Sequence, residues 1–269
     1  VGRARCYALP GVPREMQVLL RGVVLPQVAA LPGLTPTAHA WLRVLGPSEA
    51  LLGERIEPFM VPGRDPAVGI TASGGLLTIR IVGTAATRDA AAAACERTAA
   101  ELRPLLGSWL FAEGTAELPE LVVRKFTASG RTLGFAESCT AGLCSARLGD
   151  VPGASAVLCG GIVAYDNAVK TGVLDVPASL LAEHGAVSEP VAAAMAAGAR
   201  LRLGCDLAVA VTGIAGPDGG TPDKPVGTVC FAIADAAATR AWTAKFADLG
   251  RQFVRDRAVF EVWRALLQH

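Results

Sequence analysis

A serine lies where a short apolar stretch changes character, within Thr132-Leu-Gly-Phe-Ala-Glu-Ser-Cys-Thr-Ala-Gly-Leu143. The pattern predicts a strand over 132–137 that turns at Ser138 into a short helix, with the hydroxyl at the helix N-terminus. The first backbone N–H groups of a helix lack intrahelical partners. Those around residues 139–141 would point outward and, with the helix dipole, could stabilise an oxyanion during acyl transfer. The alternative role for Ser138 is that of a plain N-cap residue.

A lysine follows the next apolar run, in Gly160-Gly-Ile-Val-Ala-Tyr-Asp-Asn-Ala-Val-Lys170. We expect Tyr165 at the tip of a strand and Lys170 one turn into the following helix. The carboxyl ends of strands in an α/β sheet gather in one crevice, so Ser138 and Lys170 could meet there. A desolvated lysine loses its charge more easily and can accept the serine proton, as in Ser-Lys pairs. The alternative is that Lys170 is a solvated surface residue.

Two further segments could hold a substrate. The glycine-rich stretch VAVTGIAGPDGG at 209–220 follows a predicted buried strand, and its amides could wrap a phosphate or a carboxamide. It matches neither the Walker A nor the dinucleotide fingerprint, and a long turn is the alternative. Arg251 and Arg255 lie on the inward face of the final helix, where an anion such as a ligand phosphate would satisfy both. The alternative is that they pair with Asp256, Asp248 or another carboxylate.

The sequence offers fewer residues for other kinds of catalysis. Cys139 could act as a thiolate nucleophile, because a helix N-terminus lowers the pKa of a thiol. Of three histidines, His184 is expected to be a loop hydrogen bonder, and a His-rich catalytic metal site is hard to assemble. The seven cysteines contain no CxxC pair, so neither a zinc site nor a disulfide framework is predicted, and a reducing cytoplasm fits. We predict no metal and no cofactor.

The elements that position these residues alternate between helix and strand from Thr115 onward. The apolar run at 156–164 is typical of a strand covered on both faces. The other expected elements are a helix over 118–129, a helix over 189–203 capped by Ser188, buried strands over 207–211 and 226–234, an edge strand over 241–246 and a helix over 251–268. This rhythm predicts a layered α/β domain over 115–269.

Residues 34–114 are predicted to form a small α+β domain with a structural or dimer-forming role. Its expected elements are a strand over 39–45, a helix over 47–60 capped by Ser48, a hairpin over 67–81 around Ser73-Gly74-Gly75 and a helix over 90–106. Residues 1–33 suggest a short strand, a Pro-Gly turn and a helix start. They are too few to bury a core alone, so we expect them to be the end of a larger N-terminal domain.

The amino-acid composition limits the classes of function that the protein can have. Charge is nearly balanced, with 25 basic and 24 acidic residues among 269, and aromatic residues make up 5%. These numbers argue against a dedicated nucleic-acid binder, which needs a basic face and stacking rings, but allow a phosphorylated small molecule. No apolar stretch approaches the ~20 residues of a membrane span, and no signal-peptide pattern occurs.

Taken together, these segments resemble the C-terminal domain of the CinA family (competence- and damage-inducible protein), which includes stand-alone nicotinamide-nucleotide amidases. The matching stretches are AESCTAGL at 136–143, GGIVAYDNAVK at 160–170, HGAVS at 184–188, VTGIAGPDGG at 211–220 and, more loosely, GRQFVR at 250–255. LPGVPREM at 9–16 is similar to the end of the family's molybdopterin-binding-like N-terminal domain, and residues 34–114 resemble its KH-like domain.

The resemblance implies hydrolysis of nicotinamide mononucleotide to nicotinic acid mononucleotide and ammonia, in pyridine-nucleotide recycling. By motif position it makes Ser138 the nucleophile, Lys170 the base and Tyr165 an aid to both. The expected substrate-binding residues are Cys139, Thr140, Thr212, Gly213, Gly216, Arg251 and Arg255. Two positions depart from the family pattern, Ala141 where many members have Gly and Asp166 where Ser is common.

We therefore expect a cytoplasmic amidohydrolase that forms a homo-oligomer, a dimer, and binds a small-molecule nucleotide, with neither nucleic acid nor membrane as a partner. The alternative is a non-catalytic protein of the same family that binds a nucleotide or a partner. The pyrophosphatase activity of the family's N-terminal domain is not assigned to this chain.

Overall fold

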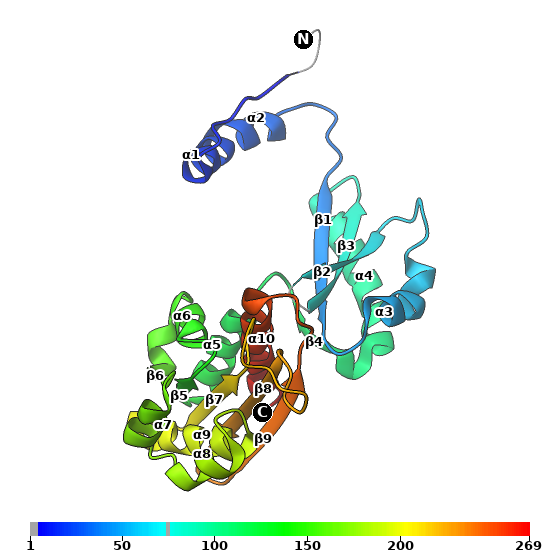
Figure 1. Cartoon of the computed structure of the whole chain (residues 1–269). Helices are drawn as coiled ribbons and strands as arrows, with labels where there is room; N and C mark the ends of the chain where they lie inside the picture. The colour runs from blue at the N-terminus through cyan, green and yellow to red at the C-terminus, as the bar shows by residue number, and fades with distance from the viewer. Residues whose placement is uncertain (1–4, 74–75) are drawn as a thin grey trace. The chain divides into compact units, whose positions relative to one another are not determined.

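The computed structural model describes residues 5–73 and 76–269 (Figure 1). They form two compact units, the first ending at Gly114 and the second beginning at Thr115. Both are mixed α/β, which confirms the predicted fold class. In the part of the chain so described, no helix combines the length and the apolar character that crossing a membrane requires.

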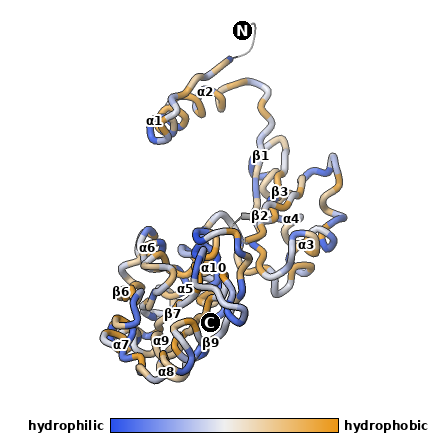
Figure 2. The backbone as a smooth tube through the Cα atoms, in the orientation of Figure 1, coloured by the Kyte–Doolittle hydropathy of each residue, from blue (hydrophilic) through white to orange (hydrophobic). Residues whose placement is uncertain are grey.

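Residues 13–29 are helical. Helix α1 (Pro13–Leu19) leads through one π-helical segment (Leu20–Val24) into α2 (Leu25–Ala29). Pro13 occupies the first turn of α1, where its fixed φ suits a helix start. Residues 5–10 form no strand, which corrects the expectation for that stretch, because a strand needs a partner for its backbone groups. Figure 2 shows how apolar these helices are, and Val18 is 71% exposed.

The first unit contains a four-stranded sheet in the order β2-β3-β1-β4. Its strands are β1 (Thr37–Val44), β2 (Ala67–Ser73), β3 (Leu76–Thr84) and β4 (Leu110–Glu113), and its helices are α3 (Glu49–Ile56) and α4 (Arg88–Leu106). As predicted, Ser48 caps α3, accepting a hydrogen bond from the Leu51 amide at 3.2 Å. The hairpin is confirmed in its two strands, although residues 74–75 of its turn lie outside the described residues.

The second unit is a five-stranded sheet in the order β6-β5-β7-β8-β9. Its strands are β5 (Leu133–Glu137), β6 (Leu158–Val163), β7 (Leu207–Gly213), β8 (Thr228–Ala234) and β9 (Thr239–Lys245). The first three run parallel, and β8 and β9 run antiparallel to their neighbours. The predicted edge strand is confirmed, because β9 lies at the end of the sheet.

Helices cover both faces of this sheet. Helix α9 (Glu189–Leu203) packs on one face beside α7 (Asn167–Leu174) and α8 (Ala178–His184). Helices α5 (Leu118–Ser129), α6 (Leu143–Gly149) and α10 (Arg251–Gln268) pack together. Trp263 of α10 meets Phe135 edge-on, and Phe135 points away from the α9 face.

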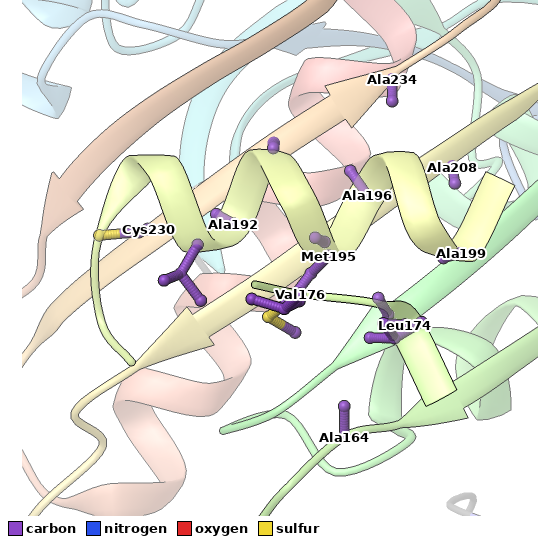
Figure 3. Packing of buried hydrophobic residues seen from close by; sticks show 14 of the residues in the cluster. Ala164, Leu174, Val176, Ala192, Met195, Ala196, Ala199, Ala208, Cys230 and Ala234 are labelled. Carbon is purple, nitrogen blue, oxygen red and sulfur yellow. The ribbon is translucent and has the colours of Figure 1, made fainter. Parts of the chain in front are cut away.

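Small side chains allow α9 to approach the sheet closely. Figure 3 shows Ala192, Ala196 and Ala199 of this helix packed beside the strands that carry Ala208 and Ala234. Gly198 serves the contact of α9 with α7 rather than with the sheet, because a Cβ there would lie 1.9 Å from the Leu174 carbonyl oxygen at the end of α7. The alanine-rich composition that marks this helix in the sequence thus sets the thickness of the layer.

The strand predicted from the apolar run at 156–164 is shorter and less covered than expected. A 3₁₀ turn occupies Ala154–Ala156, and β6 is an edge strand whose side chains alternate between half-buried and exposed. The expectation of a strand covered on both faces is therefore wrong. Its two glycines serve close packing: a Cβ on Gly161 would lie 2.0 Å from the Ser145 hydroxyl of α6.

Candidate active site

The serine lies in a turn between β5 and α6. Ser138 is 9% exposed, and α6 begins only at Leu143, after a turn over residues 138–142. Ala141 and Gly142 both have positive φ, at 51° and 87°, a conformation that suits glycine best. The prediction that the strand turns at Ser138 directly into a helix is wrong, because these two residues reverse the chain first.

A buried carboxylate occupies the helix N-terminus that had been expected to face the substrate. Glu137, 1% exposed, accepts hydrogen bonds from the amides of Cys144 at 3.0 Å and Ser145 at 2.9 Å, and from the Ser145 hydroxyl at 2.7 Å. The Ala141 amide donates to the Ser138 carbonyl at 3.0 Å. The donors at the start of α6 and at residue 141 are therefore already satisfied. Sequence reasoning missed Glu137, although an acidic residue within a buried strand was a signal.

Lys170 lies inside the protein. It is 1% exposed, which contradicts the alternative of a solvated surface residue, and its ammonium donates to the Tyr165 carbonyl at 3.1 Å. Burial lowers the pKa of Lys170, and the nearby Asp166 carboxylate offsets part of that effect. Asp166 also caps α7, because it accepts the Ala168 amide at 2.7 Å. A lysine in this setting can be neutral at a lower pH than a surface lysine.

The strand register brings the predicted residues to one edge of the sheet. The Ala164 amide donates to the Glu137 carbonyl at 2.8 Å. Tyr165 directly follows Ala164, and Ser138 directly follows Glu137, so the two residues lie at the same end of the sheet. On the other side of β5, the Ser138 amide donates to the Val211 carbonyl at 2.9 Å. Ser138 and Tyr165 therefore lie together at the carboxyl ends of β5, β6 and β7, as predicted from the topology. Between the Ser138 hydroxyl and the Lys170 amine, both within the described chain, no hydrogen bond is formed.

Arg251 links the loop that follows β6 to the loop that follows β7. Its guanidinium donates to the Tyr165 hydroxyl at 2.6 Å and to the Gly216 carbonyl at 2.9 Å. Gly216 has φ 82°, and a Cβ there would lie 2.7 Å from the Val226 side chain, so both conformation and space require glycine. Tyr165 is 53% exposed, which leaves its ring open to solvent beside Arg251.

Arg255 contacts the turn that follows β5. It donates to the Thr140 carbonyl at 2.8 Å, while its Nε is buried without a partner among the described residues. The alternative, that Arg251 and Arg255 pair with carboxylates, is wrong for both within the described chain, and Asp256 pairs with Arg147 instead. Two guanidinium groups thus lie at the N-terminus of α10 without a carboxylate partner.

Cys139 is buried beside Ser138, and burial raises the pKa of its thiol to about 12. The expected lowering by a helix N-terminus does not occur, because α6 starts later and Glu137 adds a negative charge that raises the pKa further. A thiol with this pKa is protonated at neutral pH. The geometry therefore gives little support to Cys139 as a nucleophile.

Thr212 and Gly213 end β7 in the same region. The Thr212 hydroxyl, buried, donates to the Ala186 carbonyl at 2.8 Å. Gly213 has a packing reason for its size, because a Cβ there would lie 2.7 Å from Val229. Among the residues that the structure describes, no three His, Cys, Asp or Glu side chains are grouped closely enough to hold a metal ion.

Two family models match the chain. The CinA C-terminal domain matches residues 115–269, and the damage-inducible protein CinA KH domain matches residues 39–112. A CinA-like protein from Anaeromyxobacter dehalogenans is 42% identical over 266 residues, which are 99% of this chain and 64% of that protein. Another from Citrifermentans bemidjiense is 44% identical over 245 residues, which are 89% of this chain and 57% of that protein. The chain thus spans less than two thirds of the length of these relatives.

Solved structures agree with the family models. A competence/damage inducible protein from Agrobacterium tumefaciens matches 58% of this chain and 99% of its own, with a TM-score of 0.54 and 37% identity. The competence damage-inducible protein A from Klebsiella pneumoniae matches 56% and 93%, with the same TM-score and identity. The sequence motifs, the fold and these matches together show that the chain belongs to the CinA family.

Proposed function

We propose that this protein hydrolyses the carboxamide of nicotinamide mononucleotide to nicotinic acid mononucleotide and ammonia, with Ser138 as nucleophile and Lys170 as base. The observation that carries the proposal is a lysine 1% exposed, with a lowered pKa, at the same sheet edge as a buried serine. Burying an ammonium is costly, and such a group is found where its neutral form is useful.

The reaction is acyl transfer. The neutral Lys170 amine takes the Ser138 proton as the serine oxygen attacks the carboxamide carbon. The C–N bond then breaks, and the proton on Lys170 passes to the leaving nitrogen, which departs as ammonia. Water hydrolyses the ester on Ser138 with Lys170 again as base, releasing the carboxylate and restoring the serine. General-base help of this kind contributes about 10²–10⁴-fold in rate.

For Lys170 to act on Ser138, its amine must leave the Tyr165 carbonyl oxygen, 3.1 Å away. Tyr165 follows the residue that is bonded to the Glu137 backbone, so that carbonyl lies on the strand end next to Ser138. Catalytic hydrogen bonds are often loose before substrate binds, and we expect this one to form in the complex.

The two arginines support a phosphorylated substrate. Arg251 and Arg255 have no carboxylate partner in the described chain, and guanidinium groups bind phosphate well through paired N–H donors. We propose that they hold the nucleotide phosphate while the carboxamide lies at Ser138. The free base nicotinamide has no phosphate, so it should be a far poorer substrate.

An ammonia-release assay tests the proposal. The parent chain should release ammonia in step with nicotinic acid mononucleotide, and Ser138→Ala and Lys170→Met should each lose at least about 100-fold in rate. Methionine fills most of the volume of lysine, so Lys170→Met should fold with unchanged secondary structure by circular dichroism. Full activity in either variant would refute the dyad.

The alternative function is non-catalytic nucleotide binding. It predicts that nicotinamide mononucleotide binds to the parent chain, measured by calorimetry, while no ammonia appears. Ser138→Ala distinguishes the two cases, because an enzyme without its nucleophile should still bind substrate. Turnover by the parent and binding alone by Ser138→Ala would support the amidase.

A further inference from the structure

The motif HGAVS at 184–188 takes no part in the mechanism above, yet the structure fixes it firmly. It forms the turn between α8 and α9. The Lys224 ammonium donates to the carbonyl oxygens of His184 and Val187, both at 2.8 Å. One lysine thus holds both ends of the turn through charge-assisted hydrogen bonds, which are about twice as strong as neutral ones.

Two more carbonyl groups of the turn, those of Gly185 and Ala186, also accept side-chain donors. The Ser188 hydroxyl donates to Gly185 at 2.9 Å rather than capping α9, which corrects its predicted role. The Thr212 hydroxyl donates to Ala186 at 2.8 Å. Since Thr212 follows the residue that accepts the Ser138 amide, the turn lies next to the proposed nucleophile.

Lys224 belongs to the glycine-rich loop that follows β7. Its amide donates to the Thr221 hydroxyl at 3.1 Å, and its carbonyl accepts the Thr221 amide at 2.9 Å, which closes the far end of the loop. At the base of the loop, the Gly227 amide donates to the Ile214 carbonyl at 2.8 Å. The loop is therefore closed at both ends, and Lys224 is its anchor to the 184–188 turn.

The same loop carries the acceptor for Arg251. The Gly216 carbonyl holds one guanidinium nitrogen at 2.9 Å, and the other nitrogen reaches the Tyr165 hydroxyl. A displacement of the loop would move Gly216, and the Arg251 guanidinium would lose the contact that orients it. Lys224 is thereby connected to the substrate-binding side of the site without needing to touch the substrate.

We propose that Lys224 is a positioning residue for the amidase reaction, which clamps the glycine-rich loop to the 184–188 turn and so holds Arg251 in place. The inference rests on the proposed function. It assigns no chemistry to Lys224, whose two acceptors are both carbonyl oxygens of the protein. Its effect should therefore appear mainly in substrate binding, through the proposed phosphate contact of Arg251.

The test compares three variants in the ammonia assay with nicotinamide mononucleotide. Lys224→Met removes both bonds and should raise KM about tenfold while kcat stays within about threefold, because displacing a substrate-positioning group by 1 Å can cost up to 100-fold and the Thr212 anchor remains. Lys224→Arg keeps two donors and should restore KM to within about threefold of the parent. Lys245→Met removes an exposed lysine of β9 and should change neither constant.

The outcomes distinguish a failure of the Lys224 inference from a failure of the proposed function. A purely structural lysine would lower the melting temperature of Lys224→Met and leave KM unchanged, which would overturn the inference. A loss of kcat equal to the loss of kcat/KM, with KM unchanged, would also overturn it. A parent chain that releases no ammonia would instead refute the proposed function, and the inference would fall with it.

Discussion

Two glycines inside helices should respond in opposite ways to the same substitution. Gly198 of α9 faces the end of α7, where an added Cβ would lie 1.9 Å from the Leu174 carbonyl oxygen. Gly172 of α7 is exposed and has no atom within 4 Å of the corresponding position. Both lie within helices without a positive φ, so alanine suits either backbone. We expect Gly198→Ala to destabilise the protein and Gly172→Ala to stabilise it.

The magnitudes follow from the contacts. Ordinary contact begins near 3.4 Å, so the Cβ at residue 198 requires the two helices to separate by more than 1 Å. Overpacking typically costs about 1–3 kcal/mol, and we expect the upper end because the opposing atom is backbone and cannot rotate away. At about 2–4 °C per kcal/mol for a chain of this size, the melting temperature should fall by about 6–12 °C. Gly172→Ala should gain about 0.5–1 kcal/mol from helix propensity.

The substitution also reaches the proposed site. Leu174 lies one turn after Lys170 in α7, and the Val176 amide donates to the Lys170 carbonyl at 3.0 Å. Pushing the end of α7 away from α9 should therefore move the lysine. We expect Gly198→Ala to release ammonia more slowly than the parent at 20 °C, where it is still folded.

Calorimetry of the full chain with both variants, beside ammonia assays, tests this reasoning. A Gly198→Ala variant that melts within about 1 °C of the parent would refute it, because a backbone overlap of that size cannot be free of cost. A Gly172→Ala variant that melts several degrees lower would show that the exposed helix does not follow its propensity, and the comparison would lose its control.

Two further predictions concern the residues around Ser138. With a thiol pKa of about 12, Cys139 should be thiolate in roughly one molecule in 10⁴ at pH 8, so iodoacetamide should label the exposed Cys159 and leave Cys139 and the activity intact. Labelling of Cys139 with matching inactivation, read by mass spectrometry, would contradict this. Activity should rise with pH as Lys170 deprotonates. The midpoint of this rise should lie below 10.5, the ordinary pKa of a lysine, because burial lowers the pKa of Lys170. Since the Asp166 charge raises that pKa, Asp166→Asn should move the limb to lower pH, and a shift to higher pH would show that the charge does not act on Lys170.

The boundaries of three helices were predictable from the sequence, whereas the helix predicted over 47–60 is shorter, at Glu49–Ile56. The predicted ranges 118–129, 189–203 and 251–268 match α5, α9 and α10. Their end signals are local: Gly130 and Gly204 take the left-handed conformation that closes α5 and α9. Such signals depend only on neighbouring residues, so a single sequence contains them.

Strand order and loop conformation depend on distant parts of the chain. The apolar run before Tyr165 suits a central strand as well as an edge strand, and only the assembled sheet places β6 at the edge. The turn after Ser138 needs positive φ at Ala141, which few non-glycine residues adopt, so the sequence suggested an earlier helix start. An alanine at residue 141 thus hides the turn that its positive φ makes.

The contacts that define the candidate site were the least predictable. The bond from Arg251 to Tyr165 joins residues 86 positions apart, and the bond from Arg255 to Thr140 joins residues 115 apart. Motif spacing indicated the correct sheet edge, but which side chain meets which depends on packing across the whole unit. The role of Glu137 was missed for the same reason, since its partners become visible only once α6 is placed.

The placement of charged side chains around the candidate site bears on the anionic ligand that we propose. Glu137 is the acidic group nearest Ser138 along the chain, and its oxygens are used by the amides and the hydroxyl at the start of α6. The guanidinium groups of Arg251 and Arg255, by contrast, meet carbonyl and hydroxyl oxygens, which carry no full charge. The two guanidinium groups thus have no carboxylate partner among the described residues, although the Asp166 carboxylate lies near Lys170 at the same edge and the net charge is only +1. Local placement of charge, rather than its total, is what supports a phosphate at the proposed site.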